Sequence, residues 1–386
     1  MNRATGVAIL GATGSIGRSA LAVLEQHPER FRAVALTARR SGDALARLAE
    51  RWRPALAVVS GGEVPAGAPS QGTVWRTGRE ALLEAATHPD ADVVLNALVG
   101  AAGLEPTLAA LRAGKRVALA NKESLVCGGP LVLEAAREGG GELVPVDSEH
   151  SAILQCLHGS KPSDVARLIL TASGGPFRGW TAEMLAAATP ADALRHPTWE
   201  MGAKVTIDSA TLANKALEVI EAHFLFGVPY ERIEAVVHPQ SIVHSMVEMV
   251  DGSVLAQMGF PTMELPVLYA LAYPERLPYA CRRFDPVAAG ALTFEPVGAD
   301  RFPAFALGVD AGRAGGTAPA VYNAANEVAV RHFLDGRLPF TGIAEAVAET
   351  LERCPAAPIR ALHDVLEADA RARRAAEEFV QRLAPC

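Results

Sequence analysis

The stretch Gly11-Ala12-Thr13-Gly14-Ser15-Ile16-Gly17 follows a short apolar run near the start of the chain. A glycine-rich turn between a strand and a helix lets the backbone approach a pyrophosphate, whose negative charge is favoured by the N–H groups at the helix N-terminus. The spacing differs from Gly-x-Gly-x-x-Gly, and any tight turn of this kind favours glycine. The stretch therefore predicts a dinucleotide site, with contacts from Gly11, Thr13, Gly14, Ser15, Ile16 and Gly17.

The surrounding sequence predicts an α/β fold that begins with a doubly wound, Rossmann-like parallel sheet. Short β-branched runs alternate with helical patterns up to residue 146, at residues 7–10, 33–37, 56–59, 93–97, 117–120 and 143–146. Strands that alternate with helices in this way form a parallel sheet with helices on its faces. We therefore expect residues 1–146 to form a dinucleotide-binding domain.

The pattern changes after residue 146, and we expect three further regions. Residues 147–275 read as a mixed α/β catalytic domain with strands at 167–171, 233–238 and 242–250, followed by a hairpin turn at Asp251-Gly252 and a strand at 253–258. The segment after Pro261 is rich in proline and shows no sustained periodicity, which is typical of a connecting segment, and we assign 276–300 as a linker. Residues 301–386 are helical almost throughout and predict a C-terminal helical bundle.

Composition excludes several classes of protein. The 386 residues are enough for two or three domains, and the formal net charge of -7 argues against sequence-independent nucleic-acid binding. No apolar run approaches the roughly 20 residues of a membrane helix, and the first strand starts too early for a signal peptide, so we expect a cytoplasmic protein. The cysteines are odd in number and contain no Cys-x-x-Cys pair, which argues against a disulfide framework and against a thiolate zinc site: Cys127, Cys156, Cys281, Cys354 and Cys386.

The end of the second expected strand indicates which dinucleotide binds. An acidic residue there would pair with the ribose 2′-hydroxyl of NAD, but Leu36-Thr37-Ala38 continues into Arg39-Arg40-Ser41. Two guanidinium groups suit a 2′-phosphate, although they would also fit a solvated surface pair. We therefore expect NADP(H) and hydride-transfer chemistry.

Carboxylates in two places predict an oxygen-rich metal site. Asp147 and Glu149 follow the last expected Rossmann strand, and in extended chain their side chains point the same way. Further on, Asp208-Ser209-Ala210-Thr211 reads as a helix start, with Asn214, Lys215 and Glu218 on one face of that helix. Taken singly, Asp147 could be a simple cap and Lys215 with Glu218 a solvated ion pair. Taken together, three carboxylates without thiolates suit Mg²⁺ or Mn²⁺.

A second polar group predicts an anion pocket. Ser173-Gly174-Gly175-Pro176-Phe177 follows an expected strand, and His196-Pro197-Thr198-Trp199-Glu200-Met201-Gly202 reads as an exposed loop. With Ser209, Asn214 and Lys215, these segments could bind a phosphate. Trp199 could act as a lid that excludes water, or it could be a packing residue.

Seven segments of the sequence occur together in one known family. They are residues 11–17, 120–124 (Ala-Asn-Lys-Glu-Ser), 146–150, 172–177, 196–202, 214–218 and 323–328. In order and spacing the chain closely resembles the 1-deoxy-D-xylulose 5-phosphate reductoisomerase family from about residue 6 to beyond residue 330, and only the helical character matches after about residue 335. This family rearranges and reduces 1-deoxy-D-xylulose 5-phosphate to 2-C-methyl-D-erythritol 4-phosphate in isoprenoid precursor synthesis.

The resemblance implies a role for each matching residue. NADPH would lie near Thr13, Gly14, Ser15, Ile16, Arg39, Arg40, Ser41, Asn121, Glu123 and Gly202. The divalent metal would be held by Asp147, Glu149 and Glu218. The sugar phosphate would contact Lys122, Ser148, Glu149, Ser173, His196, Ser209, Asn214, Lys215 and Glu218, and the family implies a homodimer. We expect Glu149 to transfer a proton and Lys122 to donate to an oxygen beside the nicotinamide, although an ordinary salt bridge also suits Lys122.

Two other functions fit part of the sequence. Another NADPH-dependent Rossmann oxidoreductase, of the homoserine dehydrogenase type, would not need three metal-binding carboxylates, and insensitivity to EDTA would reveal it. A dinucleotide sensor with a partner-binding helical region would bind NADPH without oxidising it. The sensor leaves the polar residues between Asp147 and Glu218 unexplained.

Overall fold

The computed structural model describes residues 3–199, 201–298 and 301–383 of the chain. Its contacts divide the chain into two compact units. The first unit comprises Met1–Ser124, Leu131–Ser151 and Thr262–Cys281, and the second comprises Leu125–Pro130, Ala152–Pro261 and Arg282–Cys386. Cys281 and Cys354 are free thiols, and Cys386 lies outside the described residues.

The first unit is built on a seven-stranded parallel sheet with the order β4-β3-β2-β1-β5-β6-β7. The strands are β1 Thr5–Leu10, β2 Phe31–Ala38, β3 Leu56–Val59, β4 Val74–Thr77, β5 Val93–Asn96, β6 Arg116–Leu119 and β7 Glu142–Pro145. Central strands of such a sheet are buried on both faces, and all residues of β3 and β5 are buried accordingly. Strands β2 to β4 are added on one side of β1, and strands β5 to β7 on the other. The crevice where doubly wound sheets bind ligands lies at this switch point between β1 and β5.

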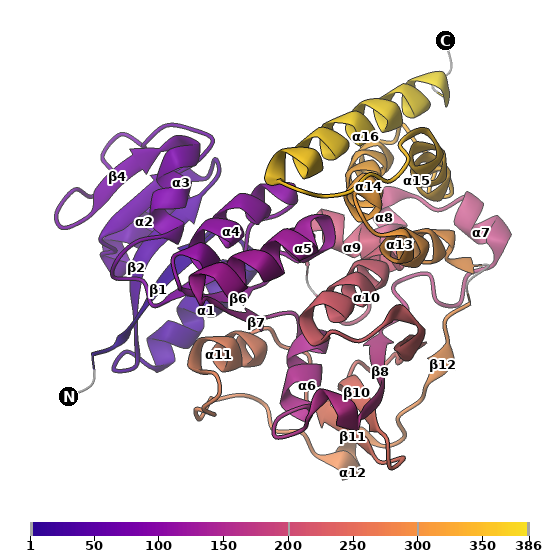
Figure 1. Cartoon of the computed structure of the whole chain (residues 1–386), viewed down its shortest axis with the longest axis horizontal. Coiled ribbons are helices and arrows are strands. Elements are labelled where there is room, and N and C mark those ends of the chain that lie inside the picture. The colour runs from indigo at the N-terminus through magenta and orange to yellow at the C-terminus, as the bar shows by residue number, and fades with distance from the viewer. Residues whose placement is uncertain (1–2, 200, 299–300, 384–386) are drawn as a thin grey trace. The chain divides into compact units, whose positions relative to one another are not determined.

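Helices of the first unit connect these strands, as Figure 1 shows in indigo to magenta. They are α1 Ser15–Gln26, α2 Gly42–Trp52, α3 Gly78–Ala86, the short η1 Ala101–Gly103, α4 Leu104–Arg112, α5 Lys122–Gly139 and the start of α6 Ser148–Cys156. The expected Rossmann-like sheet is confirmed, with β4 as a strand that the sequence did not reveal.

A further helix, α11 Glu264–Ala272, also belongs to the first unit. It packs against α1, β6 and β7. Our description of the segment after Pro261 as irregular was wrong here, because Pro266 lies in the first turn, where a helix tolerates proline. The rest of the helix is almost entirely apolar and therefore lacks an amphipathic period.

The second unit contains a five-stranded mixed sheet with the order β11-β10-β8-β9-β12. The strands are β8 Val165–Ala172, β9 Ile233–Val237, β10 Val243–Met249, β11 Val254–Met258 and β12 Glu295–Pro296. Strands β8 and β9 run parallel, whereas the other pairs are antiparallel. The predicted hairpin at Asp251-Gly252 is confirmed, since it joins β10 to β11. Apolar residues of β8, including Leu168 and Leu170, pack with Val219 and Ala222 of the helix α10 Ala213–Phe226.

The remaining helices of the second unit form short connections and a C-terminal bundle. The connections are η2 Pro162–Asp164, α7 Ala182–Ala186, α8 Pro190–Ala193, α9 Ala203–Ala210, η3 Tyr230–Arg232 and α12 Pro286–Ala289. The bundle consists of α13 Pro303–Ala314, α14 Ala318–Leu334, α15 Gly342–Arg353 and α16 Leu362–Leu383. Helix α14 packs against the other three and is buried along most of its length, so the predicted helical bundle is confirmed.

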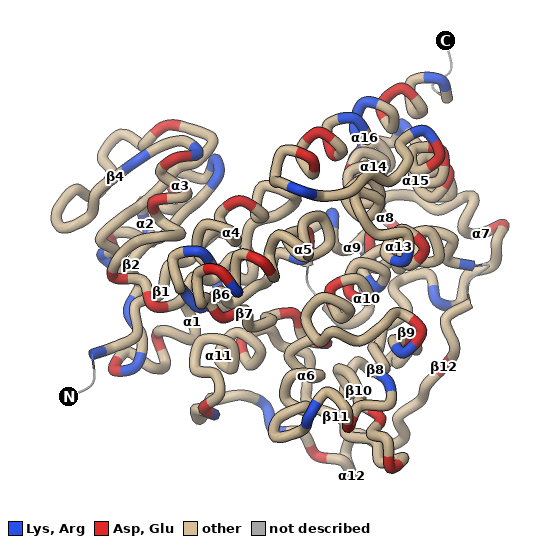
Figure 2. Tube along the Cα trace, viewed as in Figure 1, with Lys and Arg blue, Asp and Glu red and all other residues tan. Residues whose placement is uncertain are grey.

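Charged residues distinguish the outer helix of this bundle from the inner one. Acidic and basic residues follow one another along α16, whereas α14 is largely uncharged (Figure 2). Within the described ranges, no helix is both long enough and apolar enough to cross a membrane.

Candidate functional site

The glycine turn of the first unit lies at the carboxyl end of β1, beside the crevice. Gly11 has a φ of 89°, a conformation that only glycine adopts without strain, and its N–H donates to the Thr37 hydroxyl over 3.0 Å. A Cβ atom on Gly17 would lie 2.5 Å from the Gly11 carbonyl oxygen and 2.6 Å from the Ala12 Cα. Helix α1 can therefore start directly against the strand only because Gly17 has no side chain.

The first turn of α1 leaves its polar backbone groups accessible. Gly14 is the N-cap residue, and both Gly14 and Ser15 are exposed, while Thr13 and Ile16 are half-buried. The N–H groups of a first helical turn have no partner within the helix, so they favour an anion.

Arg39 and Arg40 directly follow β2 and are both exposed. Ser41 follows them as the N-cap residue of α2, and its side chain makes no capping hydrogen bond. The two guanidinium groups therefore lie one strand away from the glycine turn, since β1 and β2 are neighbours in the sheet.

Asn121 and Glu123 are buried and hold the loop that follows β5. The Asn121 amide donates to the carbonyl oxygens of Leu98 and Gly100, each over 3.0 Å, and to Glu123 Oε2 over 2.8 Å. Glu123 Oε1 accepts the Gly100 N–H over 3.2 Å. These two predicted cofactor residues thus shape the wall of the crevice through their own hydrogen bonds.

Asp147, Ser148 and Glu149 form the start of α6 in the first unit. Our expectation of an extended segment with Asp147 and Glu149 on one side was wrong, because the helix already begins at Ser148. Instead, Asp147 Oδ1 accepts the Glu149 N–H over 3.2 Å, as a helix cap does, and the Ser148 hydroxyl donates to Glu149 Oε2 over 2.5 Å. The cap brings both carboxylates to the same helix end.

Lys122, at the start of α5, donates from its ammonium group to Asp147 Oδ2. Both side chains are largely buried, with exposed fractions of 16% and 11%. The buried His150 ring has its Nδ1 3.4 Å from Asp147 Oδ1. Asp147 therefore accepts from a cation and also caps the helix. The sequence did not reveal His150, which belongs to the 146–150 segment but received no role.

In the second unit, Ser173, His196 and Ser209 form a hydrogen-bonded group. His196 Nε2 lies 3.0 Å from Ser173 Oγ and 3.1 Å from Ser209 Oγ. The Trp199 N–H donates to His196 Nδ1 over 2.9 Å, so Nδ1 carries no proton. Burial lowers the pKa of His196, which favours a neutral ring with its proton on Nε2. Three polar groups, from the residue after β8, from a loop and from α9, thus converge, as the predicted anion pocket requires.

Trp199 and Gly202 flank Glu200, which lies outside the described residues. The Trp199 ring is half-buried, with its centroid 6.4 Å from that of His244. Gly202 is exposed and serves as the N-cap residue of α9.

Asn214, Lys215 and Glu218 lie in the first turns of α10. The Lys215 ammonium donates to one Glu218 oxygen, and the Asn214 amide donates to the other. Our alternative of a solvated ion pair is wrong for these residues, because the side chains of Lys215 and Glu218 are only 4% and 1% exposed. A buried carboxylate and a buried ammonium need polar partners inside the protein, and these two groups contact each other.

Asp208 does not start the helix that carries these residues, in contrast to our expectation. It lies in the last turns of α9, and the break before α10 falls at Leu212, which has a φ of 57°. The buried Asp208 carboxylate instead accepts the Asn326 amide over 2.8 Å and lies 2.8 Å from the Lys204 ammonium. The sequence signal for this pairing was a charged residue, Asp208, among the apolar residues of α9.

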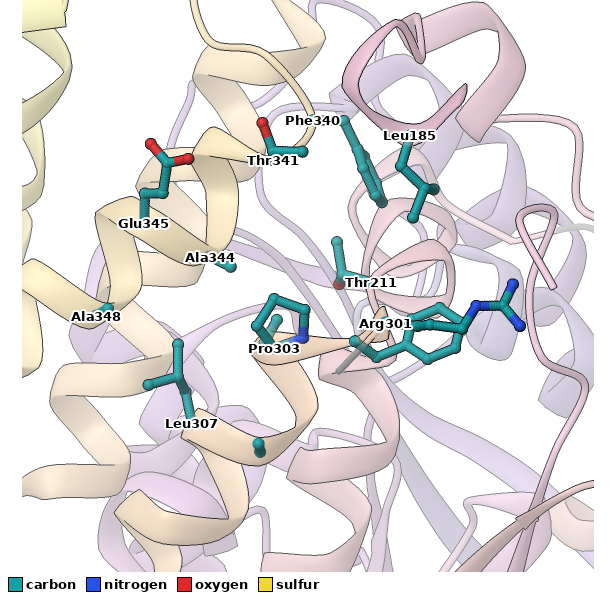
Figure 3. Close-up of a pocket in the computed structure, with 13 residues that line it drawn as sticks. Leu185, Thr211, Arg301, Pro303, Leu307, Phe340, Thr341, Ala344, Glu345 and Ala348 are labelled. Atoms are coloured by element: carbon teal, nitrogen blue, oxygen red, sulfur yellow. The ribbon is translucent and has the colours of Figure 1, made fainter. Parts of the chain in front are cut away.

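A pocket of about 620 Å³ also lies in the second unit, between α13, α15 and α7 (Figure 3). Leu185 and Phe340 lie side by side at one end of it, and Ala344 and Ala348 of α15 line another side. The complete lining is Leu185, Thr211, Arg301, Phe302, Pro303, Ala304, Ala306, Leu307, Phe340, Thr341, Ala344, Glu345 and Ala348. None of the predicted site residues lines this pocket.

Models of one protein family match most of the chain. The 1-deoxy-D-xylulose 5-phosphate reductoisomerase model matches residues 7–129, and two models of the C-terminal domains of this reductoisomerase match residues 143–226 and 258–375. The chain belongs to the 1-deoxy-D-xylulose 5-phosphate reductoisomerase family. The reductoisomerase of Ralstonia nicotianae is 55% identical over 97% of this chain and 98% of its own length. That of Symbiobacterium thermophilum is 54% identical, with 98% and 99% covered.

Solved structures of the reductoisomerase family share the fold. The Zymomonas mobilis enzyme, in complex with NADPH, has a TM-score of 0.90 and 44% identity, covering 98% of this chain and 99% of its own. A reductoisomerase in complex with NADPH, fosmidomycin and magnesium has a TM-score of 0.91 and 40% identity, with the same coverage. A homoserine dehydrogenase from Thiobacillus denitrificans is 18% identical with a TM-score of 0.45, which carries no argument for our alternative function.

Proposed function

We propose that this chain converts 1-deoxy-D-xylulose 5-phosphate into 2-C-methyl-D-erythritol 4-phosphate, using NADPH and a divalent metal, Mg²⁺ or Mn²⁺. Membership of the reductoisomerase family supports the reaction. The observation that carries the proposal is that each unit contains a largely buried ion pair between a lysine and a carboxylate. These pairs are Lys122 with Asp147 and Lys215 with Glu218. Such pairs concentrate ionised oxygens, which suit a hard cation, and ammonium groups, which suit a sugar phosphate.

Asp147, Glu149 and Glu218 are our proposed metal ligands. Asp147 and Glu149 lie in the first unit and are half-buried, Glu218 lies in the second and is buried, and together the three carboxylates would hold the metal ion. Their oxygens suit Mg²⁺ or Mn²⁺ and not a thiolate-seeking metal. When bound, the cation would polarise the carbonyl and hydroxyl oxygens of the sugar. The donors around these carboxylates support the fit: Lys122 donates to Asp147, the Ser148 hydroxyl to Glu149, and Asn214 and Lys215 to Glu218.

The dinucleotide site is our proposal for NADPH. The first turn of α1 would bind the pyrophosphate through the residues from Gly11 to Gly17, and Arg39, Arg40 and Ser41 would bind the 2′-phosphate. Asn121 and Glu123 would shape the nicotinamide side of the crevice, with Gly202 as a further contact. Support comes from the accessible N–H groups of α1 and from the two exposed guanidinium groups that follow β2.

The second unit supplies our proposed phosphate pocket. Ser173, His196, Ser209, Asn214 and Lys215 would bind the phosphate group, and the convergence of the first three on His196 Nε2 supports this role. Ser148 would contact the sugar. Binding energy from the phosphate, which lies apart from the reacting carbons, would help Trp199 to close over the site.

Proton transfer at the sugar would involve Glu149 and Lys122. Glu149 would accept a proton from a sugar hydroxyl, and its Oε2 already accepts the Ser148 hydroxyl. Lys122 at the start of α5 would donate to an oxygen next to the nicotinamide.

The decisive experiment measures NADPH oxidation with purified protein, Mn²⁺ and 1-deoxy-D-xylulose 5-phosphate. The protein should oxidise NADPH, EDTA should abolish the reaction, and added Mn²⁺ should restore it. Glu218→Gln should lower the rate more than about 100-fold, since even residues behind a metal ligand contribute 10- to 100-fold. NADPH should still bind to this variant in a fluorescence titration.

Glu221→Gln is the matched control for this experiment, because Glu221 is buried in the same helix one turn later. It should keep the metal-dependent reaction. No NADPH oxidation by the unaltered protein, or normal turnover by Glu218→Gln, would overturn the proposal.

We further propose that the protein is a cytoplasmic homodimer. Strand β11 is an edge strand with Val254, Leu255 and Met258 all more than a third exposed, and an apolar edge of this kind pairs readily with a second copy. Free thiols fit a reducing compartment. The division into an NADPH-binding domain (1–146), a catalytic domain (147–275), a linker (276–300) and a helical domain (301–386) remains part of the proposal. Sedimentation equilibrium measures the oligomeric state.

A further inference from the structure

We propose that Asn326 is a positioning residue for the phosphate pocket and acts through Asp208. This inference rests on the proposed function, because it assigns Asn326 to the support of that pocket. Asn326 lies on α14, in the C-terminal bundle, and Asp208 lies on α9.

The contact between Asp208 and Asn326 is buried and charged. Asn326 is fully buried and Asp208 is 1% exposed, and the Asn326 amide donates to Asp208 Oδ1 over 2.8 Å. A carboxylate oxygen only accepts hydrogen bonds at neutral pH, so the NH₂ side of the amide must face it. Lys204 neutralises the other oxygen of Asp208 at 2.8 Å. Removal of the amide would therefore leave a buried acceptor without its donor.

The helix that carries Asn326 is held firmly. Helix α14 packs against α13, α15 and α16, and it also packs against α9. Ala329, Val330 and Phe333 of α14 share an apolar cluster with Ile207 and Ala210 of α9. Apolar contacts hold the two helices together, and the polar pair fixes their register, because a hydrogen bond of this kind forms at one relative position only.

Asp208 connects this register to the phosphate pocket. Ser209 is its neighbour, and the Asp208 carbonyl oxygen accepts the Thr211 hydroxyl over 3.2 Å. The same hydroxyl oxygen accepts the Ala213 N–H over 3.2 Å, at the start of α10. A shift of Asp208 would therefore displace Ser209 together with the first turn of α10, which carries Asn214 and Lys215.

The test compares Asn326→Ala with Asn323→Ala. Asn323 is equally buried one turn earlier on α14, but its amide donates within the helix, to Glu327 Oε1 over 3.1 Å. Both substitutions should lower the melting temperature. Only Asn326→Ala should raise KM for 1-deoxy-D-xylulose 5-phosphate, by about tenfold or more, since small misplacements of binding groups have effects of this size. The Kd of NADPH should not change in either variant.

A second pair of variants keeps the inference testable if Asn326→Ala does not fold. The substitution Asn326→Asp places a second carboxylate opposite the Asp208 carboxylate. The double variant Asp208→Asn with Asn326→Asp restores the pair, with the amide donor on α9 and the carboxylate acceptor on α14. The double variant should recover a KM closer to that of the unaltered protein than Asn326→Asp does. A KM unchanged in Asn326→Ala, or raised equally in Asn323→Ala, would overturn the positioning role, as would a double variant no better than Asn326→Asp.

A substrate-dependent rise in melting temperature, measured without NADPH, separates the two proposals. The rise depends on sugar phosphate binding and not on turnover. If the substrate raises the melting temperature but NADPH is not oxidised, only the proposed reaction is contradicted. The positioning role is then tested by the size of this rise in melting temperature, which should be smaller in Asn326→Ala and unchanged in Asn323→Ala.

Discussion

The glycine turn of the first unit and the start of α10 in the second unit hold their candidate residues by different physical means. In the first unit the glycine turn depends on backbone geometry, with a positive φ at Gly11 and a helix that starts against a strand because Gly17 lacks a Cβ. In the second unit the candidate residues depend on buried polar pairs, such as Lys215 with Glu218. A substitution that adds atoms should therefore destabilise the glycine turn, whereas a substitution that removes a charged partner should destabilise the buried ion pair.

The largest effect should follow from loss of the Lys215 ammonium. Lys215→Met keeps most of the side-chain volume but removes the ammonium group that donates to the buried Glu218 carboxylate. Breaking a buried ion pair typically costs about 3–5 kcal/mol. Urea unfolding of the metal-free protein measures the change in the free energy of unfolding.

Arg313→Met is the control for Lys215→Met. Arg313 pairs with Asp310 at the same three-residue spacing on α13, but these side chains are 50% and 70% exposed. An exposed pair contributes less than about 1 kcal/mol. Adding Glu218→Gln to Lys215→Met should recover part of the lost stability. Equal losses in the buried and exposed pairs would mean that the start of α10 does not depend on its buried ion pair.

The next largest effect should follow from an added methyl group in the glycine turn. Gly17→Ala places a Cβ 2.5 Å from the Gly11 carbonyl oxygen, and backbone atoms cannot move away as a flexible side chain would. Overpacking of this kind costs about 1–3 kcal/mol, and the turn should also lose NADPH affinity in a fluorescence titration.

Gly14→Ala is the matched control in the same turn. Its Cβ would lie 3.3 Å from the Gly11 carbonyl oxygen, a contact that a small shift relieves, and its φ of -76° suits any residue. The variant should therefore lose much less affinity than Gly17→Ala. Similar losses in both would mean that the turn does not depend on the close start of α1.

The same contrast decides what could be predicted from the sequence. Backbone sites follow local patterns, and both the glycine turn and six of the seven strands of the first sheet were predicted close to their observed positions. The seventh, β4, is a short edge strand whose residues are mostly exposed, so its pattern is weak. Helix α11 was missed because Pro266 and an unbroken apolar sequence concealed its period.

Buried polar pairs depend on contacts between distant residues, which no local pattern encodes. Asn326 lies 118 positions after Asp208, and their contact exists only once α14 packs on α9. Lys215 and Glu218 were recognised as neighbours on one helix, but their burial depends on the rest of the second unit. The extended start assigned to Asp147 failed because the cap at Ser148 turns the chain directly into α6.

A smaller effect on cofactor binding should follow from loss of the two arginines after β2. Arg39→Ala with Arg40→Ala removes exposed side chains and leaves the backbone of β2 unchanged, so stability should hardly change. If both contact the 2′-phosphate, KM for NADPH should rise by about tenfold or more while KM for NADH stays constant. Parallel steady-state measurements with the two cofactors test this. A parallel rise in both values would contradict a 2′-phosphate contact.

The smallest effect concerns the pH dependence of stability in the second unit. Burial lowers the pKa of His196 below its ordinary value of 6.5, so the unfolded chain binds a proton at this residue more readily than the folded protein does. The contribution of His196 to stability is therefore present above the unfolded pKa and is lost as the pH falls through 6.5 toward the folded pKa. His196→Gln removes this titration, and melting temperatures measured between pH 5 and pH 8 should fall less steeply for the variant on the acidic side. The same slope in both proteins would mean that the ring is as easily protonated in the folded state as in water, and the neutral donor assigned to Nε2 would then be wrong.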